Sequence, residues 1–300
     1  MKQSRTDKIF TVINFTLFTI MVILMIYPLI FVLSASVSDP MAVNGGKVVF
    51  FPKGLSFDSY QEVIKETKVW RAYANTIFYV AVDVGMSLLI MLPLCYALSR
   101  PDKFRFANQL SFMIAFTMLF GGGMVPLYIV LKKLHMINTV WSIVLHQTVQ
   151  PWLIMVTLTF FRGLPKSLME AAEIDGASFE YTFRKIVLPL SASIIVVIAL
   201  FRFVGQWNNF FDPLIFFNDP KKFSLQLVLR NILLENQSMA SGMDASMLTG
   251  EAAAEAYRRG LLAETMKYAL IVVSTLPVLL IYPFMQKHLV KGVMIGAIKG

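Results

Sequence analysis

Long apolar stretches without charge dominate the pattern of this chain. A membrane core about 30 Å thick is crossed by about 20 apolar residues in a helix, and the sequence contains six such stretches. They are longer and more continuous than the alternating strands of a membrane barrel. Because lipid admits only helices or closed barrels, the pattern predicts an all-α polytopic membrane protein. The predicted transmembrane helices are residues 10–34, 72–98, 106–131, 137–161, 186–217 and 268–286, after an N-terminal segment of residues 1–9.

The composition supports a membrane protein and excludes several other classes. Apolar residues make up 57% of the 300 residues and charged residues 15%, whereas soluble proteins carry about 25% charged residues. One cysteine excludes an internal disulfide, and three histidines without ligand spacing predict no metal site. The net charge of +9 comes from basic residues that flank the apolar stretches, so we expect no nucleic-acid partner.

The orientation of the spans is only partly readable from charge. Lys and Arg are equally numerous on the two sides, but they are denser in the short segments on the side of both termini. Basic residues near the spans favour the cytoplasm, so both termini are predicted to be cytoplasmic. The first apolar stretch exceeds the 7–15 residues of a signal peptide and is expected to be retained as a helix.

The loop between the fourth and fifth spans has its own helical signals. Ser167 and Glu170 have the spacing of a capping box, which predicts the start of a short helix. Asp175 and Gly176 then predict its end, because glycine tolerates a positive φ angle. A second short helix is predicted to follow. Three of its apolar residues recur at helical spacing and share one face, namely Phe179, Phe183 and Ile186.

Two interpretations of this helical loop follow from the residues alone. It is either a self-contained bracket at the membrane surface or an element whose apolar side chains enter the groove of a partner protein. The segment Glu170-Ala-Ala-Glu-Ile-Asp-Gly-Ala177 and the residues after it resemble the EAA loop of ABC-importer permease subunits. The resemblance implies a cytoplasmic coupling loop over residues 163–189. Its implied contacts to an ATPase are Glu170, Ala171, Ala172, Asp175, Gly176, Ala177, Phe179, Phe183, Ile186 and Pro189.

The resemblance extends over most of the chain. One group of motifs is similar to the carbohydrate-importer branch, with subunits of the maltose-permease G type: Asn75-Thr76, Cys95-Tyr-Ala-Leu-Ser-Arg100, Pro126-Leu-Tyr128 and Asn138-Thr139. A second group resembles the oligosaccharide permeases of the lipoprotein-operon and alginate or pectin-fragment type: Phe120-Gly-Gly-Gly-Met-Val-Pro126, Gly205-Gln-Trp-Asn-Asn-Phe210, Leu225-Gln-Leu-Val-Leu-Arg230 and the closing segment of residues 287–300.

This resemblance implies an importer that is assembled from several chains. The fold would be the type I ABC importer permease fold in a bacterial inner or plasma membrane. The partners would be a second homologous permease in a heterodimer, two ATP-binding-cassette subunits inside and a solute-binding protein outside. ATP and Mg would be bound by the ATPase subunits, with no cofactor in this chain. The residues agree, because no phosphate loop of the Gly-x-x-x-x-Gly-Lys-Ser/Thr type is present.

A polar stripe within the fifth predicted span is a candidate substrate pathway. Arg202 is too costly to face lipid, and Gln206 and Asn209 lie within about 40° of it on a helix. An adjacent tryptophan can stack on a sugar face. An interhelical hydrogen-bond network between the two permease subunits is the alternative. Two glutamines beside a kink predicted at Pro151 extend the candidate set, which comprises Arg202, Gln206, Trp207, Asn209, Gln147 and Gln150.

Other functions were weighed against the importer. An ion-coupled secondary carrier would need charged residues in the spans and an internal repeat, whereas the two acids in the spans are isolated. Asp83 suits pairing with a neighbouring helix or protonation in place, and Asp212 suits a cap or a pairing role. A membrane enzyme would need a constellation of catalytic groups, and none is found. Gly121–Gly123 with Pro126 predict a break in the third span, as either a hinge or a helix end.

Overall fold

The computed structural model describes residues 5–242 and 251–297, which are almost entirely helical. Within these ranges there is no β-strand, only an isolated bridge between Ser38 and Leu55. The first four residues, residues 243–250 and the last three residues of the closing motif lie outside the described part. The chain divides into two compact units, residues 1–70 with 229–276, and residues 71–228 with 277–300.

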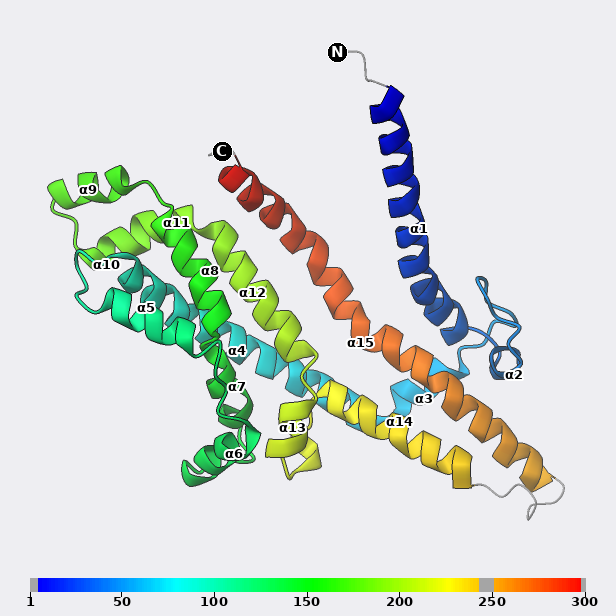
Figure 1. Ribbon diagram of the computed structural model, residues 1–300. Coiled ribbons are helices and arrows are strands. Elements are labelled where there is room, and N and C mark those ends of the chain that lie inside the picture. The colour runs from blue at the N-terminus through cyan, green and yellow to red at the C-terminus, as the bar shows by residue number, and fades with distance from the viewer. Residues whose placement is uncertain (1–4, 243–250, 298–300) are drawn as a thin grey trace. The chain divides into compact units, whose positions relative to one another are not determined.

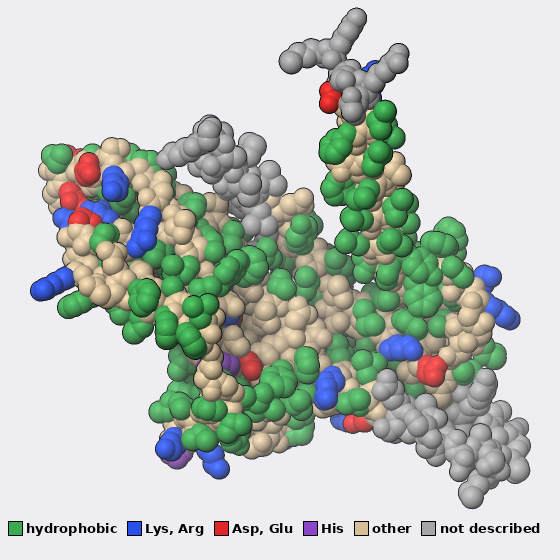
Figure 2. All heavy atoms as spheres, in the orientation of Figure 1, with side chains coloured by type: hydrophobic (Ala, Val, Ile, Leu, Met, Phe, Trp, Pro, Cys, Tyr) green, Lys and Arg blue, Asp and Glu red, His purple; other side chains and the backbone are tan. Residues whose placement is uncertain are grey.

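The first unit contains α1 (Arg5–Ser36), α2 (Pro40–Asn44) and α3 (Asp58–Lys65), together with parts of α14 (Leu225–Gly242) and α15 (Glu251–Ala297). Apolar side chains cover α1 on all sides, and none of its most apolar window is buried (Figure 2). A helix that is apolar all round is stable only in an apolar surrounding, which identifies α1 as lipid-facing.

Polar contacts hold the segment of residues 37–57 in the first unit against its helices. The Ser34 hydroxyl donates to the carbonyl of Phe50 at 2.7 Å, and Tyr60 donates to Ser36 at 2.9 Å. The hydroxyl groups of Ser59 and Thr265 lie 3.0 Å apart between α3 and α15. These serine and threonine contacts replace the apolar packing that holds soluble helices together, as is usual between membrane helices.

The second unit carries the helices around both candidate sites. Figure 1 shows α9 and α10 at one end of this unit and α6 and α13 at the other. Its elements are α4 (Thr67–Ser99), α5 (Ala107–Phe116), α6 (Met124–Lys133), α7 (Trp141–Thr148), α8 (Pro151–Arg162), α9 (Lys166–Ile174), α10 (Phe179–Thr182), a π-helical turn (Phe183–Val187), α11 (Leu188–Leu190), α12 (Ala192–Trp207), α13 (Phe211–Phe216) and a 3-10 turn (Pro220–Lys222).

The main core of the second unit joins α4, α5, α8, α9 and α12. Met91, Cys95, Leu153, Ile154 and Ile198 are fully buried there. A second cluster around Tyr79, Ile143 and Phe216 lies toward the α6 and α13 end. Because α9 contributes Met169 to the main core, the loop that carries the EAA sequence is anchored to the membrane helices by apolar packing.

The polar motif residues near the α13 end support a loop over residues 218–224. Asn75 donates to the carbonyls of Lys221 and Phe223, and the Thr76 hydroxyl accepts the amide hydrogen of Leu225. Asn138, which has a positive φ of 63°, accepts amide hydrogens from Asn218 and Asp219. These side chains satisfy backbone groups that the broken helices leave without partners.

The membrane spans are less regular than the sequence pattern predicts. Three described helical segments are long and apolar enough to cross a membrane, namely Asp7–Ser36, Thr67–Ser99 and Gly260–Pro283. Two bent pairs also qualify if each pair is one span, which gives up to five. The bends are 41° between α7 and α8 and 78° between residues 179–190 and α12. The prediction of six spans is therefore not settled by helix length.

The third predicted span, residues 106–131, is not one helix. Helix α5 ends at Phe116, and α6 begins only at Met124, after Gly123 with φ of 82°. Three successive glycines contribute no side chains to stabilise a helix and favour irregular backbone. The break predicted at Gly121–Gly123 is confirmed, and the predicted kink at Pro151 is confirmed by the bend between α7 and α8.

Candidate functional site

The EAA sequence folds as α9 and the turn that follows it. The helix ends at Ile174, and Gly176 has a φ of 78°. The amide of Ala177 donates to the carbonyl of Ala172, and that of Gly176 donates to Glu173. This pattern is a Schellman motif, in which the residue after the helix adopts the left-handed conformation. The helix stop predicted at Asp175 and Gly176 is confirmed.

The predicted capping box at the start of this helix is wrong. Helix α9 begins at Lys166, with Pro165 as its N-cap, two residues before the predicted N-cap Ser167, and has no side-chain cap hydrogen bond. The fixed φ of Pro165 presets the chain for helix entry, so Ser167 lies inside the first turn. The next helix does have a side-chain cap, because the Ser178 hydroxyl accepts the amide hydrogen of Tyr181 at 3.1 Å.

Two aromatic residues of the second short helix dock on one buried ring. Tyr96 is 2% exposed, and Phe179 and Phe183 both stack on it, with ring centroids 4.4 Å and 5.1 Å away. Aromatic pairs of this kind contribute about 0.5–1.5 kcal/mol each beyond their buried area. The shared face predicted for Phe179 and Phe183 thus packs on α4, within this chain.

A cluster of ion pairs also ties α9 to the end of α4. Arg100 donates to Asp102 at 2.8 Å and to Glu173 at 2.6 Å, and Lys103 lies 3.0 Å from Glu173. The hydrogen bond from Lys103, followed by that from Arg100, lowers the pKa of Glu173. The hydrogen bond between Arg100 and Asp102 lowers the pKa of Asp102. The same hydrogen bond is the main cause of the raised pKa of Arg100.

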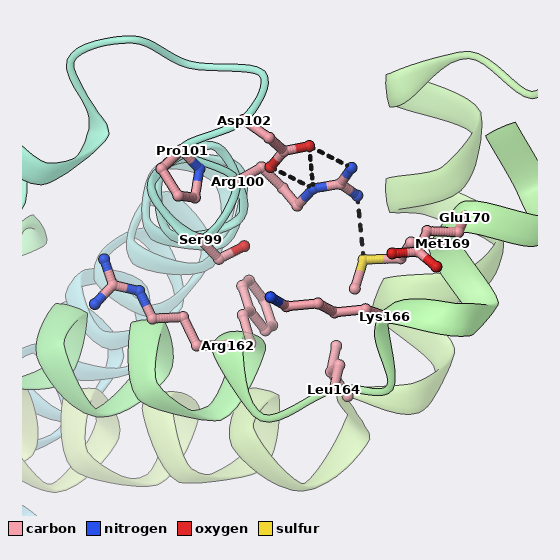
Figure 3. A pocket seen from close by; sticks show the side chains of 10 residues that line it. Ser99, Arg100, Pro101, Asp102, Arg162, Leu164, Lys166, Met169 and Glu170 are labelled. Atoms are coloured by element: carbon pink, nitrogen blue, oxygen red, sulfur yellow. Dashed lines mark hydrogen bonds and ion pairs between the residues drawn. The ribbon is translucent and has the colours of Figure 1, made fainter.

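A cavity of about 300 Å³ lies beside this cluster, between the ends of α4 and α8 and the start of α9. Figure 3 shows Arg100 and Asp102 facing each other close to the sulfur of Met169, to which Arg100 also donates at 3.5 Å. Arg162 and Lys166 contribute two further positive charges to the lining. Charged side chains gather on the surface of this end of the unit (Figure 2).

The rest of the loop surface is exposed. Ile174 is 87% exposed, although it is a large apolar residue, and Phe179 is 44% exposed. Of the residues that the resemblance implicates, Ala172 is buried, and Ala177, Phe183 and Ile186 are intermediate. The exposed members of that set are Glu170, Ala171, Asp175, Gly176, Phe179 and Pro189.

A second cavity, of about 740 Å³, lies among α7, α8, α12 and α13. Five of the six candidate pathway residues line it, although they come from two separate stretches of sequence: Arg202, Gln206, Asn209, Gln147 and Gln150. The sixth, Trp207, does not line it. Its ring is 2% exposed and packs against Tyr73 and Phe203.

Arg202 is held by a buried partner in this chain. It donates to Asp83 of α4, and the two residues are 4% and 0% exposed. The pairing predicted for Asp83 with a neighbouring helix is therefore confirmed. An ion pair in a span neutralises two charges that would each be costly in lipid, so this contact locks α12 to α4.

Asp212 organises the polar side chains at the other end of the cavity. Its carboxylate accepts hydrogen bonds from Asn209 at 2.8 Å and from Gln147 at 3.3 Å, and it lies 3.4 Å from His146. The Asp212 amide donates to the Asn209 side chain in return. The pairing role expected for Asp212 is confirmed. Within residues 5–242 and 251–297, no group of His, Cys, Asp and Glu has the arrangement of a metal site.

Comparison with known proteins identifies the family. Residues 1–295 match the family of binding-protein-dependent transport system inner membrane components. The chain belongs to this family. The loop over residues 163–189 is therefore its characteristic EAA loop, and the chain is a membrane-embedded permease subunit with the ABC importer permease fold.

Relatives of this permease agree over nearly their whole length. The polygalacturonan/rhamnogalacturonan transport system permease protein YtcP of Bacillus subtilis (strain 168) is 32% identical, covering 98% of this chain and 99% of its own. Protein LplC of the same strain is 33% identical, covering 100% and 98%. A chain in the crystal structure of a bacterial ABC transporter involved in the import of the acidic polysaccharide alginate matches with a TM-score of 0.84 and 30% identity, covering 96% of this permease and 99% of that chain.

The permease also has site residues that the sequence did not single out. Tyr96 and Arg100 lie in a motif that carried the resemblance, yet nothing in their spacing pointed to the EAA loop. Trp152 and Phe201 also line the larger cavity. They lie close to the predicted pathway residues Gln150 and Arg202 in the sequence, but an aromatic side chain beside other apolar residues gave no sign of its direction.

Proposed function

We propose that this chain is the membrane-spanning permease subunit of an ATP-driven importer that carries an oligosaccharide, a fragment of a polysaccharide, across a bacterial cell membrane. The anchored EAA loop carries this proposal. Its α9 is fixed to the membrane helices by core packing, ring stacking and ion pairs. A loop held in this way moves with the helices, while its outer surface stays free for a partner.

The partner that suits this outer surface is a separate ATPase. The exposed residues of the EAA loop would contact it, with Ile174 as an apolar anchor for a groove. Two such subunits would bind ATP and Mg, while this permease would pair with a second homologous permease and receive its sugar from an external solute-binding protein. The loop, and with it both termini, would then be cytoplasmic.

The larger cavity would form part of the sugar pathway. Amide side chains and aromatic rings together line it, which is the usual composition of a ligand site that combines apolar walls with a few polar groups. The relatives named for polygalacturonan, rhamnogalacturonan and alginate transport support fragments of acidic polysaccharides as the substrate class.

The charges within the spans suit this function better than ion coupling. Asp83 is paired with Arg202, and Asp212 contacts His146, Asn209 and Gln147. Carboxylates held by permanent partners suit structural roles, whereas a proton relay needs acids that exchange protons during transport. The relatives offer no support for an ion-coupled carrier.

The test is uptake by the complex that co-purifies with this tagged permease, reconstituted in liposomes. We expect uptake of galacturonan fragments to require ATP and the solute-binding protein. Cysteine crosslinking should join position 174 to the ATPase subunit, and protease protection should place residues 170–189 on the ATPase side. Uptake that continues without ATP, or a loop exposed on the opposite side, would contradict the proposal.

A further inference from the structure

Two aromatic side chains form an open apolar face in the larger cavity. Trp152 of α8 and Phe201 of α12 both line it, with ring centroids 5.0 Å apart and ring planes at 68°. Their exposed fractions are 43% and 49%. The aliphatic face of a pyranose ring packs on an aromatic surface of this kind, because its C–H groups are attracted to the negative face of the ring.

The hydrogen-bonding groups of the cavity are held in fixed orientations. The amide nitrogen of Gln147 donates to Asp212, so the carbonyl oxygen of Gln147 remains to accept a hydrogen bond from a ligand. The carbonyl oxygen of Gln206 accepts from Asn209 at 3.5 Å, so the amide nitrogen of Gln206 remains to donate. An acceptor and a donor in one cavity match the hydroxyl groups of a sugar.

The formal charges at this cavity are already taken up by the protein. Arg202 is paired with Asp83, and Asp212 lies against His146 and two amide groups. Arg202 and Asp83 are both buried, so a substrate carboxylate that drew Arg202 away would leave a buried carboxylate without its partner. Gln147, Gln150 and Gln206 add neutral amide groups to the lining.

Gly205 leaves room beside the aromatic face, because glycine has no side chain. Gly205 lies one helical turn after Phe201 on α12 and also lines the cavity. A Cβ atom built at Gly205 meets no protein atom within 4 Å. The space next to Phe201 is therefore open, although an ordinary helical residue would occupy it.

We propose that Trp152, Phe201 and Gly205 form a subsite that binds one sugar ring of the passing oligosaccharide. The ring lies with its face on Trp152 and Phe201 in the space above Gly205, and its hydroxyl groups bond to Gln147 and Gln206. The subsite recognises the shape of the sugar ring and its hydroxyl groups. Arg202 does not bind the acidic groups of the substrate. This inference rests on the proposed function.

The aromatic face is tested by kinetics of the reconstituted complex with galacturonan fragments, their methyl esters and alginate fragments. We expect Trp152→Leu to raise the KM for uptake about three- to tenfold, the range given by one aromatic contact, and Trp152→Phe to restore most of the loss. Trp141→Leu is the matched control, since Trp141 is also 43% exposed but does not line the cavity. Equal KM values for Trp152→Leu and the wild type would overturn the subsite.

The space at Gly205 is tested by filling it. Gly205→Ala should assemble into the complex at the wild-type level, because a Cβ atom there meets no protein atom within 4 Å. Gly205→Val places a larger side chain in the same space. Uptake should fall with the first substitution and fall further with the second. Gly85→Ala is the control, because Gly85 is a helical glycine with equally open space that lies outside the cavity.

The outcomes separate the subsite from the proposed function. Loss of assembled complex in Gly205→Ala would mean that a partner helix packs on Gly205, and unchanged uptake in both Gly205 variants would mean that the space is not used. Either result overturns the subsite and leaves the importer intact. Uptake that is independent of ATP, or a wild-type complex that imports none of the three probes, would overturn the proposed function and the subsite with it.

Discussion

The guanidinium group of Arg100, one residue beyond α4, donates a hydrogen bond to the carboxylate of Glu173 on α9 at 2.6 Å. Glu173 is the second glutamate of the EAA sequence. Arg100 is only 11% exposed in its side chain, and Glu173 is 34% exposed. A charged hydrogen bond that is partly shielded from water is stronger than one at the open surface. The pair is therefore a mechanical link between a membrane helix and the EAA loop.

Removing this link should weaken coupling more than it weakens folding. In Glu173→Gln the charge is lost, while Tyr96 and Met169 still hold the loop. We expect the amount of sugar imported per ATP hydrolysed to fall severalfold, measured in liposomes. Glu180→Gln is the matched control, because the Glu180–Arg184 pair has the same chemistry but is 69% exposed on both sides. A Glu180 variant that is impaired as strongly as the Glu173 variant would contradict this role.

The ion cluster also predicts a pH dependence of stability. The pKa values of Glu173 and Asp102 are lowered in the folded protein, so their stabilisation is complete above the ordinary carboxylate pKa and is lost as the pH falls through the lowered values. The raised pKa of Arg100 acts only at strongly alkaline pH. We expect the difference in Tm between wild type and Glu173→Gln to be constant at about pH 6–8 and to shrink as the pH falls through the lowered pKa of Glu173. A difference that grows on acidification would refute the cluster.

Gly176 should tolerate substitution only as far as its backbone allows. Its φ of 78° lies in the left-handed region, and a Cβ atom there meets nothing within 4 Å. The cost is therefore one of backbone conformation, about 1–2 kcal/mol for an ordinary residue and more for a β-branched one. We expect the loss of uptake and of ATPase binding to increase in the order Gly176→Asn, Gly176→Ala, Gly176→Val. An equal loss in all three variants would point to a direct contact instead.

Removing one partner of the buried pair Asp83–Arg202 should lower the stability of the protein strongly, whereas replacing both with apolar residues should lower it little. Arg202→Met leaves a buried carboxylate without its partner, which costs about 3–5 kcal/mol. The double variant Asp83→Leu with Arg202→Met removes both charges and should recover most of that loss. Detergent-solubilised complexes report both effects through expression level and Tm.

Transport by the double variant separates the two roles of Arg202. We expect it to retain the wild-type preference between galacturonan fragments and their neutral methyl esters, because Arg202 is occupied by Asp83. A selective loss of the acidic fragments would show that Arg202 binds substrate carboxylates.

The residues of the EAA loop illustrate how far the sequence could be read. The helix stop at Gly176 follows from the backbone freedom of one residue, so it was predictable. The predicted N-cap at Ser167 lies two residues after the observed one, Pro165, whose fixed φ suits helix entry without a side-chain hydrogen bond. The stacking of Phe179 and Phe183 on Tyr96 could not be foreseen, since it joins residues more than 80 positions apart.

The candidate pathway shows the same limit. Helical spacing placed Gln206 and Asn209 on the side of Arg202, and the structure adds Gln147 and Gln150 to the same cavity. It also buries Trp207 and presents Trp152 instead. Trp207 has polar neighbours in the sequence and is buried, whereas Trp152 lines the cavity, because the direction of a side chain depends on how whole helices pack.

Local chemistry in the sequence determined that this chain is helical and membrane-embedded and that its third and fourth predicted spans are broken, because hydropathy, glycine and proline act over a few residues. The EAA loop was identified by its resemblance to the family. Only the tertiary structure decided that Arg100 holds Glu173, that Asp83 neutralises Arg202 and that Trp152 lines the cavity. Each of these contacts joins distant segments whose meeting depends on the packing of whole helices, and no local pattern encodes that packing.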